Sequence, residues 1–370
     1  MVISAIYKHL KDGTPVLLSV YPPTQLKNSR VPAIVYFHGG GLVVGNRYSW
    51  HPTWLQKRVN DLGFAFIAPD YRLIPPSTGH SVLEDIKDVF TFLNETELSK
   101  AARPSSEEAF VSFDIDKGAI AVAGASAGGL CAYLAAVHCK SPKPRAVLSL
   151  YGMGGDFLTP HYLSPKNKIF FRGQPLVNPA DFSDYLYPFP PTSNLKEIVD
   201  SPLAYHPADH PTPGYPANQR MSLVRLYFQL GTYLDYYTGC HSLGLSENLR
   251  RLLSTNQDES VDSGNVRKAE RNSPSFAEVI PEQCHGLFPQ FNITSNWPRT
   301  ILCHGTADTA VPIEESRALG RSLTNVGVIV RNFEIDGEDH VFDVQANAED
   351  KYGKTFDEIV DTLVEWVIDK

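Results

Sequence analysis

The sequence predicts an α/β fold, in which a mostly parallel central sheet is flanked by helices and interrupted by one large insertion. Over the first 150 residues, short apolar runs suited to buried strands alternate with patterns typical of amphipathic helices. The same alternation returns after residue 297, beyond a stretch rich in proline and aromatic residues. Because parallel strands are joined by helical crossovers, this order favours one sheet built from both parts of the chain.

The elements are expected in the following order. Two strand-like runs at the start should pair as a hairpin around Asp12-Gly13, a favoured turn pair. Four apolar runs suited to strands follow, at 33–38, 64–71, 119–124 and 146–152. Helical patterns lie between them, at 53–62, 82–93 and 127–140. After the insertion we expect a strand at 299–305, a helix at 313–323, a strand at 328–335 and a helix at 356–370.

Residues 153–297 are predicted to form the insertion, a largely helical and irregular lid, with residues 1–152 and 298–370 forming the core. The insertion contains two helical patterns, at 217–237 and 243–253. The polar, aromatic-free run at 254–275 predicts a loop. Aromatic residues of the insertion are expected to make the inner surface of the lid: Tyr185, Tyr187, Phe189, Tyr233, Tyr236 and Tyr237.

The composition argues against several classes of protein. Lysine and arginine total 33 against 41 aspartate and glutamate residues, a net charge of −8, which disfavours a nucleic-acid surface. No uncharged apolar run reaches about 18 residues, so we expect no membrane span. Five cysteines without a C-x-x-C pair, together with a start that lacks secretory-signal features, predict a cytoplasmic protein with reduced thiols.

The strongest chemical signal is "AVAGASAGGL", residues 121–130, in which Ser126 lies between Gly124 and Gly128. A G-x-S-x-G motif between a strand and a helix is typical of a nucleophile elbow, a tight turn that exposes a reactive serine. Larger residues at the two glycine positions would collide with the neighbouring strand and helix. The helix would also direct the positive end of its dipole at the reaction centre. We therefore predict Ser126 as the nucleophile.

A serine hydroxyl needs a base to take its proton, and the base needs an acidic group to orient it. After an elbow of this kind, the acid and then the histidine follow along the chain. Asp308 comes just after the returning strand in "CHGTADTAVP", and His340 follows the next strand in "IDGEDHVFD". We predict Ser126, Asp308 and His340 as a catalytic triad, and a structural role for His304.

Donors for a tetrahedral oxyanion are predicted in two places. Ala127 follows the nucleophile and can offer its backbone N–H, and "HGGG" at 38–41 follows the third strand. We predict Gly40 and Gly41 as the further donors, with Gly39 as the alternative. His38 is expected to hold this loop through a hydrogen bond. Gly40→Ala is expected to depress turnover far more than folding stability.

Together these residues resemble the hormone-sensitive-lipase-like branch of the α/β-hydrolase superfamily, specifically its fungal members. The resemblance rests on the two glycine motifs, Asp308, His340, and two further segments, "DYRLIP" at 70–75 and "LED" at 83–85. It implies the α/β-hydrolase fold, a carboxylic-ester hydrolase with a broad apolar acyl pocket, and neither cofactor nor metal. Ala125 replaces the aspartate usual in the family's GDSAGG motif, which bears on substrate preference.

The predicted function is hydrolysis of a carboxylic ester, lactone or thioester of a medium-sized hydrophobic small molecule through an acyl-enzyme. If the fungal resemblance holds, the substrate belongs to secondary, polyketide metabolism. Leu42, Tyr151 and Val341 are the predicted substrate-binding residues. The same triad would also support acyl transfer or cyclisation. A different class of function, a non-catalytic small-molecule receptor on the same fold, remains open.

Overall fold

The computed structural model describes residues 2–98, 103–104, 113–258 and 275–369. Within them, nine strands form one sheet in the order β5-β1-β2-β4-β3-β6-β7-β8-β9. From one edge to the other these are β5 (Arg103–Pro104), β1 (Ile3–His9), β2 (Pro15–Tyr21), β4 (Ala65–Pro69), β3 (Arg30–Phe37), β6 (Asp114–Ala125), β7 (Ala146–Leu150), β8 (Arg299–Gly305) and β9 (Val330–Ile335). The predicted α/β-hydrolase architecture, with its mostly parallel sheet, is confirmed.

The first two strands form the expected hairpin. β1 and β2 are antiparallel, and the turn between them is closed by a 2.8 Å hydrogen bond from the Leu10 N–H to the Thr14 carbonyl. Gly13 has a φ of +88°, a conformation that glycine adopts without strain. β2 then pairs antiparallel with β4, and from β4 to β9 all neighbouring strands are parallel.

The parallel strands end together, and this brings the predicted site residues to one edge of the sheet. Phe37, the last residue of β3, is in register with Gly124 of β6, and Ala125 is in register with Leu150 of β7. At the other side, Gly305 of β8 lies opposite Ile335 of β9. The loops that follow these strands therefore meet at their carboxyl ends, where sheets of this kind carry their sites.

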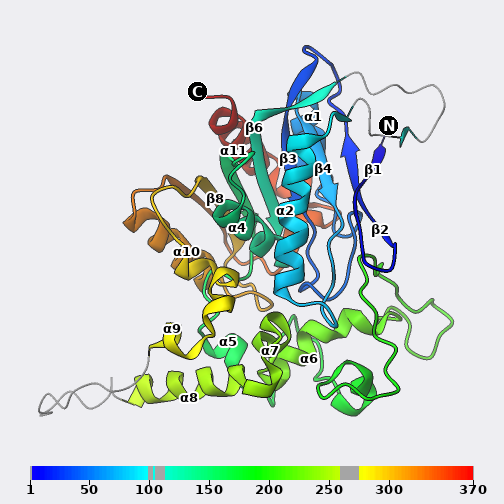
Figure 1. The fold of residues 1–370 in the computed structure, drawn as a ribbon, viewed down its shortest axis with the longest axis vertical. Helices are drawn as coiled ribbons and strands as arrows, with labels where there is room; N and C mark the ends of the chain where they lie inside the picture. The colour runs from blue at the N-terminus through cyan, green and yellow to red at the C-terminus, as the bar shows by residue number, and fades with distance from the viewer. Residues whose placement is uncertain (1, 99–102, 105–112, 259–274, 370) are drawn as a thin grey trace, which may run out of the picture.

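Helices cover both faces of the sheet (Figure 1). α1 (Thr53–Asp61) and α11 (Ala348–Ile368) share one apolar core with the sheet. α2 (Gly79–Glu95), α4 (Ala127–His138) and α10 (Ile313–Asn325) contribute to the core on the opposite face. α11 begins eight residues before the predicted helix, and η6, a single 3₁₀ turn at Phe342–Val344, precedes it.

Residues 153–297 connect β7 to β8, and Figure 1 shows their helices below the sheet. This insertion contains α5 (Pro160–Leu163), η1 (Pro179–Tyr185), η2 (Gln219–Ser222), α6 (Leu223–Leu230), α7 (Tyr233–Thr238), η3 (His241–Leu243), α8 (Leu245–Asp258), α9 (Phe276–Val279), η4 (Glu282–Leu287) and η5 (Pro289–Phe291). Most of the loop predicted at 254–275 lies outside the described residues, and its first residues belong to α8. Among the described helices, none has the length and apolar character needed to cross a membrane.

The single helix predicted over 217–237 is wrong, because the chain breaks at Gly231. This residue has a φ of +64° and ends α6 in a left-handed cap. A Cβ at Gly231 would lie 2.6 Å from the Leu163 carbonyl oxygen, so the chain of α5 passes close to the break. The result is two short helices, α6 and α7, in place of the single predicted helix.

Candidate active site

Ser126 occupies the one position between β6 and α4, with φ 55° and ψ −120°. This is a strained conformation for a residue with a side chain, as a nucleophile elbow requires. The two glycines around it leave no room for larger residues. A Cβ at Gly124 would lie 2.0 Å from the Gly128 carbonyl oxygen, and a Cβ at Gly128 would lie 2.0 Å from the Phe37 carbonyl oxygen. The motif therefore packs β3, β6 and α4 tightly behind the serine.

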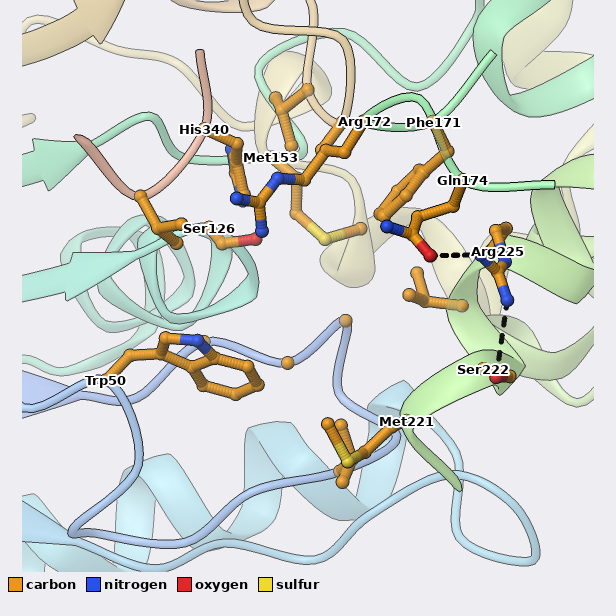
Figure 2. Close-up of a pocket in the computed structure, with 18 of the residues that line it drawn as sticks. Trp50, Ser126, Met153, Phe171, Arg172, Gln174, Met221, Ser222, Arg225 and His340 are labelled. Atoms are coloured by element: carbon orange, nitrogen blue, oxygen red, sulfur yellow. Dashed lines mark hydrogen bonds between the residues drawn. The ribbon is translucent and has the colours of Figure 1, made fainter. Parts of the chain in front are cut away.

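The structure brings Asp308 and His340 together from two different loops. The Nδ1 of His340 lies 2.6 Å from the Oδ2 of Asp308, and both residues are buried. Since the ionised carboxylate only accepts hydrogen bonds, Nδ1 carries the proton and Nε2 is left as a base. Ser126 and His340 line one cavity, on the same side of it in Figure 2.

Four hydrogen bonds converge on Asp308. Its Oδ1 accepts from the backbone N–H groups of Ala310 and Val311, at 2.8 and 2.9 Å. Its Oδ2 accepts from His340 and also from the Nε2 of His304, at 3.1 Å. Burial alone would raise the pKa of the Asp308 carboxyl, but His340 and the hydrogen bonds from both histidines outweigh it and hold the pKa well below its usual range.

His304 holds Asp308, the acid of the predicted triad, through a hydrogen bond. Sequence reasoning did not predict this contact. The Nε2 of His304 also lies 2.8 Å from the Val311 carbonyl, and its Nδ1 lies 2.7 Å from the Ser316 hydroxyl. Because both partners of Nε2 are acceptors, the ring donates there and accepts at Nδ1. The sequence signal that could have indicated the contact between His304 and Asp308 is their spacing of four residues at the end of a strand.

The "HGGG" loop follows β3 and borders the cavity with Gly39, Gly40 and Gly41. Gly40 has a φ of +102° and Gly41 a φ of +64°, which favour glycine at both positions. Among the described residues, none accepts a hydrogen bond from the N–H of either glycine. Ala127 is the first residue of α4, so its N–H has no partner within the helix. These three N–H groups remain the predicted oxyanion donors.

The expectation that Gly40→Ala would spare folding does not fit this geometry. A Cβ on Gly40 would lie 2.0 Å from the Val44 carbonyl oxygen, which itself belongs to the loop. The backbone would have to move, and the left-handed φ adds strain for alanine. This substitution would therefore disturb the loop and the N–H donors together.

His38 and Tyr71 hold the glycine loop in place. Their rings stack with centroids 4.3 Å apart, and the Tyr71 hydroxyl donates to the His38 carbonyl at 2.7 Å. Burial lowers the pKa of His38 to about 4, so the ring is neutral and its Nδ1–H donates to the Gly39 carbonyl at 2.7 Å. His38 thus has the loop-holding contact expected for it. Through Tyr71, the "DYRLIP" segment also supports the glycine loop.

Arg220 of the insertion fixes the same loop from the other side. Its Nε donates to the Val43 carbonyl at 2.7 Å, and its Nη2 donates to the Ile74 and Pro75 carbonyls, both at 2.9 Å. The side chain is buried, and its guanidinium also lies over the Tyr185 ring, 5.7 Å from the ring centroid. It therefore links η2 to the glycine loop and to the "DYRLIP" segment.

The cavity has a volume of about 360 Å³ and lies between the core and the insertion. Of the three predicted substrate-binding residues, Tyr151 and Val341 line it. Leu42 does not: it is fully buried in the apolar core, and its carbonyl accepts a 2.8 Å hydrogen bond from the Ile74 N–H.

Among the described residues, no cluster of His, Cys, Asp and Glu side chains could hold a metal ion.

Tyr151 also supports the catalytic histidine. Its ring packs edge-on against His340, with centroids 4.6 Å apart, and its hydroxyl donates to Asp343 at 2.5 Å. Asp343 in turn accepts a 2.9 Å hydrogen bond from the Trp54 indole. Burial raises the pKa of the Asp343 carboxyl, and the two donors partly oppose this.

The insertion contributes side chains to the cavity that differ from those expected. None of the six predicted aromatic residues is among the lining residues; Tyr233, Tyr236 and Tyr237 are buried in the core that joins the insertion to the sheet. The lining comes from the segment around 171–174 and from η2 and α6, notably Phe171, Met221, Val224 and Phe228. Arg172 and Arg225 also line it, and sequence reasoning identified neither.

Known proteins resemble this chain in sequence and in fold. A family model described as "alpha/beta hydrolase fold" matches residues 34–211. A probable carboxylesterase, M8, of Phoma sp. is 31% identical over 39% of this chain and 45% of the relative. The non-reducing polyketide synthase pkbA of Emericella nidulans is 23% identical over 94% of this chain but only 13% of the synthase. The chain thus spans less than half the length of these curated relatives.

A solved α/β hydrolase superfamily protein of Enterococcus faecalis shares the fold, with a TM-score of 0.59, 16% identity and 97% of both chains covered. The elbow serine, the glycine loop after β3 and the order of nucleophile, acid and histidine agree with this match. The chain therefore has the α/β-hydrolase fold, and its residues 34–211 resemble that family in sequence.

Proposed function

We propose that this protein cleaves a carboxylic ester, lactone or thioester through an acyl-enzyme formed on Ser126. The observation that carries this proposal is the 2.6 Å contact between Asp308 and the Nδ1 of His340, beside a serine in an elbow conformation. With Nδ1–H held by Asp308, the Nε2 of His340 takes the Ser126 proton as the hydroxyl attacks the carbonyl.

The remaining steps follow from the same groups. The N–H groups of Gly40, Gly41 and Ala127 stabilise the tetrahedral oxyanion, and the positive end of α4 adds to their effect. His340 then gives its proton to the leaving alcohol or thiol, which leaves the acyl group on Ser126. Water, deprotonated by the same histidine, releases the acid and restores the serine.

The cavity suits a medium-sized substrate with an apolar part. Its volume of about 360 Å³ and its aromatic and aliphatic lining match those of small-molecule sites. The similarity of nearly the whole chain to a segment of a polyketide synthase favours an acyl group of the polyketide type. In this proposal residues 153–297 act as the lid, because they supply much of the cavity wall.

Acyl transfer or cyclisation is the second candidate, and the polyketide-synthase similarity is the observation that favours it. The acyl-enzyme would then be released by an alcohol or by a nucleophile on the substrate itself. Product analysis in the presence of a competing alcohol separates the two: free acid alone supports hydrolysis, whereas an ester of the added alcohol supports transfer. A receptor without catalysis is disfavoured because Ser126, Asp308 and His340 are all present.

Phosphonate labelling tests the proposal. We expect a fluorophosphonate probe to label the wild-type protein at Ser126, and Ser126→Ala to abolish labelling. Hydrolysis of p-nitrophenyl hexanoate should fall at least about 10³-fold in the same variant. Ser254→Ala, at an exposed serine on α8, is the matched control and should keep both activities. A wild-type protein that neither reacts with the probe nor hydrolyses the ester would refute the proposed function.

A further inference from the structure

Two arginines face the cavity in a protein that carries a net charge of −8. Arg172 and Arg225 both come from the insertion, and neither has a role in the reaction described above. A single carboxylate side chain, Asp339, is among the residues that line the same cavity. Positive side chains in a cavity are stabilised by anionic groups. The contacts of each guanidinium show whether the protein itself supplies such a group.

Arg225, on α6, has no carboxylate partner within the described part of the chain. Its Nη1 lies 3.4 Å from the Gln174 amide oxygen and its Nη2 lies 3.5 Å from the Ser222 hydroxyl, the two contacts drawn in Figure 2. Both are at the outer limit for a hydrogen bond. The Nε is buried and has no partner among the residues that the structure describes. A half-buried guanidinium thus retains most of its hydrogen-bonding capacity.

Arg172 lies on the other side of the cavity. In the view of Figure 2 its side chain extends into the cavity on the side of Ser126 and His340, opposite Arg225. Its φ of +48° is left-handed, and its N–H donates to the Thr309 hydroxyl at 2.9 Å. The Nε lies 3.9 Å from Asp339, whose carboxylate already accepts a 2.9 Å hydrogen bond from the Thr309 N–H. Its contact with Asp339 therefore leaves donors of the guanidinium free.

We infer that Arg225 and Arg172 recognise an anionic group on the substrate, a carboxylate or a phosphate. The inference rests on the proposed function, because it assigns the substrate of the same site. A planar guanidinium binds such oxyanions through paired hydrogen bonds, and this attraction is stronger in a partly buried cavity than in water. Apolar residues such as Phe171, Val224 and Phe228 line the same cavity, so the substrate combines an apolar body with a charged end.

The test compares esters that differ only in charge. Hydrolysis of p-nitrophenyl hexanoate is measured against mono-p-nitrophenyl adipate, which carries a carboxylate on an acyl chain of equal length. A second pair, hexanoyl-coenzyme A and the hexanoyl thioester of N-acetylcysteamine, presents or lacks phosphate on the leaving group. We expect Arg225→Met to lower kcat/KM for the anionic member of one pair at least about tenfold more than for its neutral member, mainly through KM. Arg172→Met should act in the same direction.

The controls separate charge from folding and from the chemistry itself. Arg225→Lys keeps the charge and should recover part of the preference, and Arg251→Met removes an exposed arginine of α8 that does not line the cavity. A loss confined to the adipate pair identifies a carboxylate, and one confined to the coenzyme A pair identifies a phosphate. Ratios unchanged in both arginine variants would overturn the inference while neutral hydrolysis still upholds the proposed function. Absence of hydrolysis and labelling would overturn the function itself.

Discussion

At the scale of single residues, Asp308 shows why the acid of this site cannot be exchanged for its amide. Each carboxylate oxygen has two donors: Oδ1 accepts from the Ala310 and Val311 N–H groups, and Oδ2 accepts from His340 and His304. An asparagine must keep its oxygen toward the two backbone donors. Its NH₂ group would then face two histidine N–H groups.

Asp308→Asn is therefore expected to lower kcat/KM for p-nitrophenyl hexanoate by about 10³–10⁴-fold. His340 would have to accept a hydrogen bond at Nδ1, which moves its proton to Nε2 and removes the base for Ser126. Ester hydrolysis and phosphonate labelling measure the effect, and Asp336→Asn, at an exposed position in the neighbouring loop, serves as control. Activity within about tenfold of the wild type would contradict a catalytic role for Asp308.

The triad was predictable because each member follows a strand of the sheet, and parallel strands deliver the residues after them to one edge. The role of Arg172 was not predictable, because this residue lies in an irregular segment without a period from which the direction of its side chain could be read. The contact of His304 with Asp308 was not predicted, for a related reason. Its partner Asp308 is four residues away in a loop, and the turn that returns the carboxylate to the strand end is set by tertiary contacts.

At the scale of elements, the glycine loop depends on contacts from both sides. The Tyr71 segment supports it from the core, and Arg220 of the insertion donates to three carbonyls around it. Predicting the strands was straightforward because their apolar runs are continuous. The helix predicted at 217–237 was wrong because its apolar pattern continues across Gly231, and the close approach of Leu163 at that residue is a long-range feature.

Arg220→Met is expected to lower the free energy of unfolding by about 3 kcal/mol, since it leaves buried carbonyls without donors. It should also lower kcat, even when kcat is measured at a temperature well below that of unfolding. The reason is that the loop that carries Gly40 and Gly41 loses its link to η2. Urea unfolding and ester hydrolysis measure the two effects, with Arg251→Met as the surface control. If stability falls while kcat stays unchanged, Arg220 supports the fold without positioning the loop.

At the scale of the whole molecule, the insertion is joined to the core through a buried carboxyl. Glu315 on α10 accepts hydrogen bonds from the Gly154 N–H at 2.6 Å and from the Tyr162 hydroxyl at 2.5 Å. Gly154 and Tyr162 lie near the start of the insertion, and the sequence predicted only that Glu315 would belong to a helix over 313–323. Its burial depends on how the insertion packs, which a single sequence pattern does not encode.

This carboxyl makes the stability of the molecule depend on pH. Burial raises the pKa of Glu315 from 4.5 to about 8, although the hydrogen bonds from Tyr162 and Gly154 oppose the shift. Between these values the folded protein binds more protons at this site than the unfolded chain does. The free energy of unfolding therefore decreases as the pH rises through this range, by at most about 1.4 kcal/mol per pH unit for one proton.

Glu315→Gln should remove this contribution, because the amide is neutral at every pH and can still accept from Gly154 and donate to Tyr162. Urea unfolding at several pH values between about 5 and 8 should show a shallower decline than in the wild type, with the variant relatively more stable at the alkaline end. Other buried carboxyls, such as Asp70 with a pKa raised to about 6 by burial, are common to both proteins and cancel in the difference. Glu314→Gln changes an exposed neighbour and should leave the slope as it is. Parallel wild-type and Glu315→Gln curves would contradict the raised pKa of Glu315, because they would mean that its carboxyl is ionised in the folded protein over this pH range.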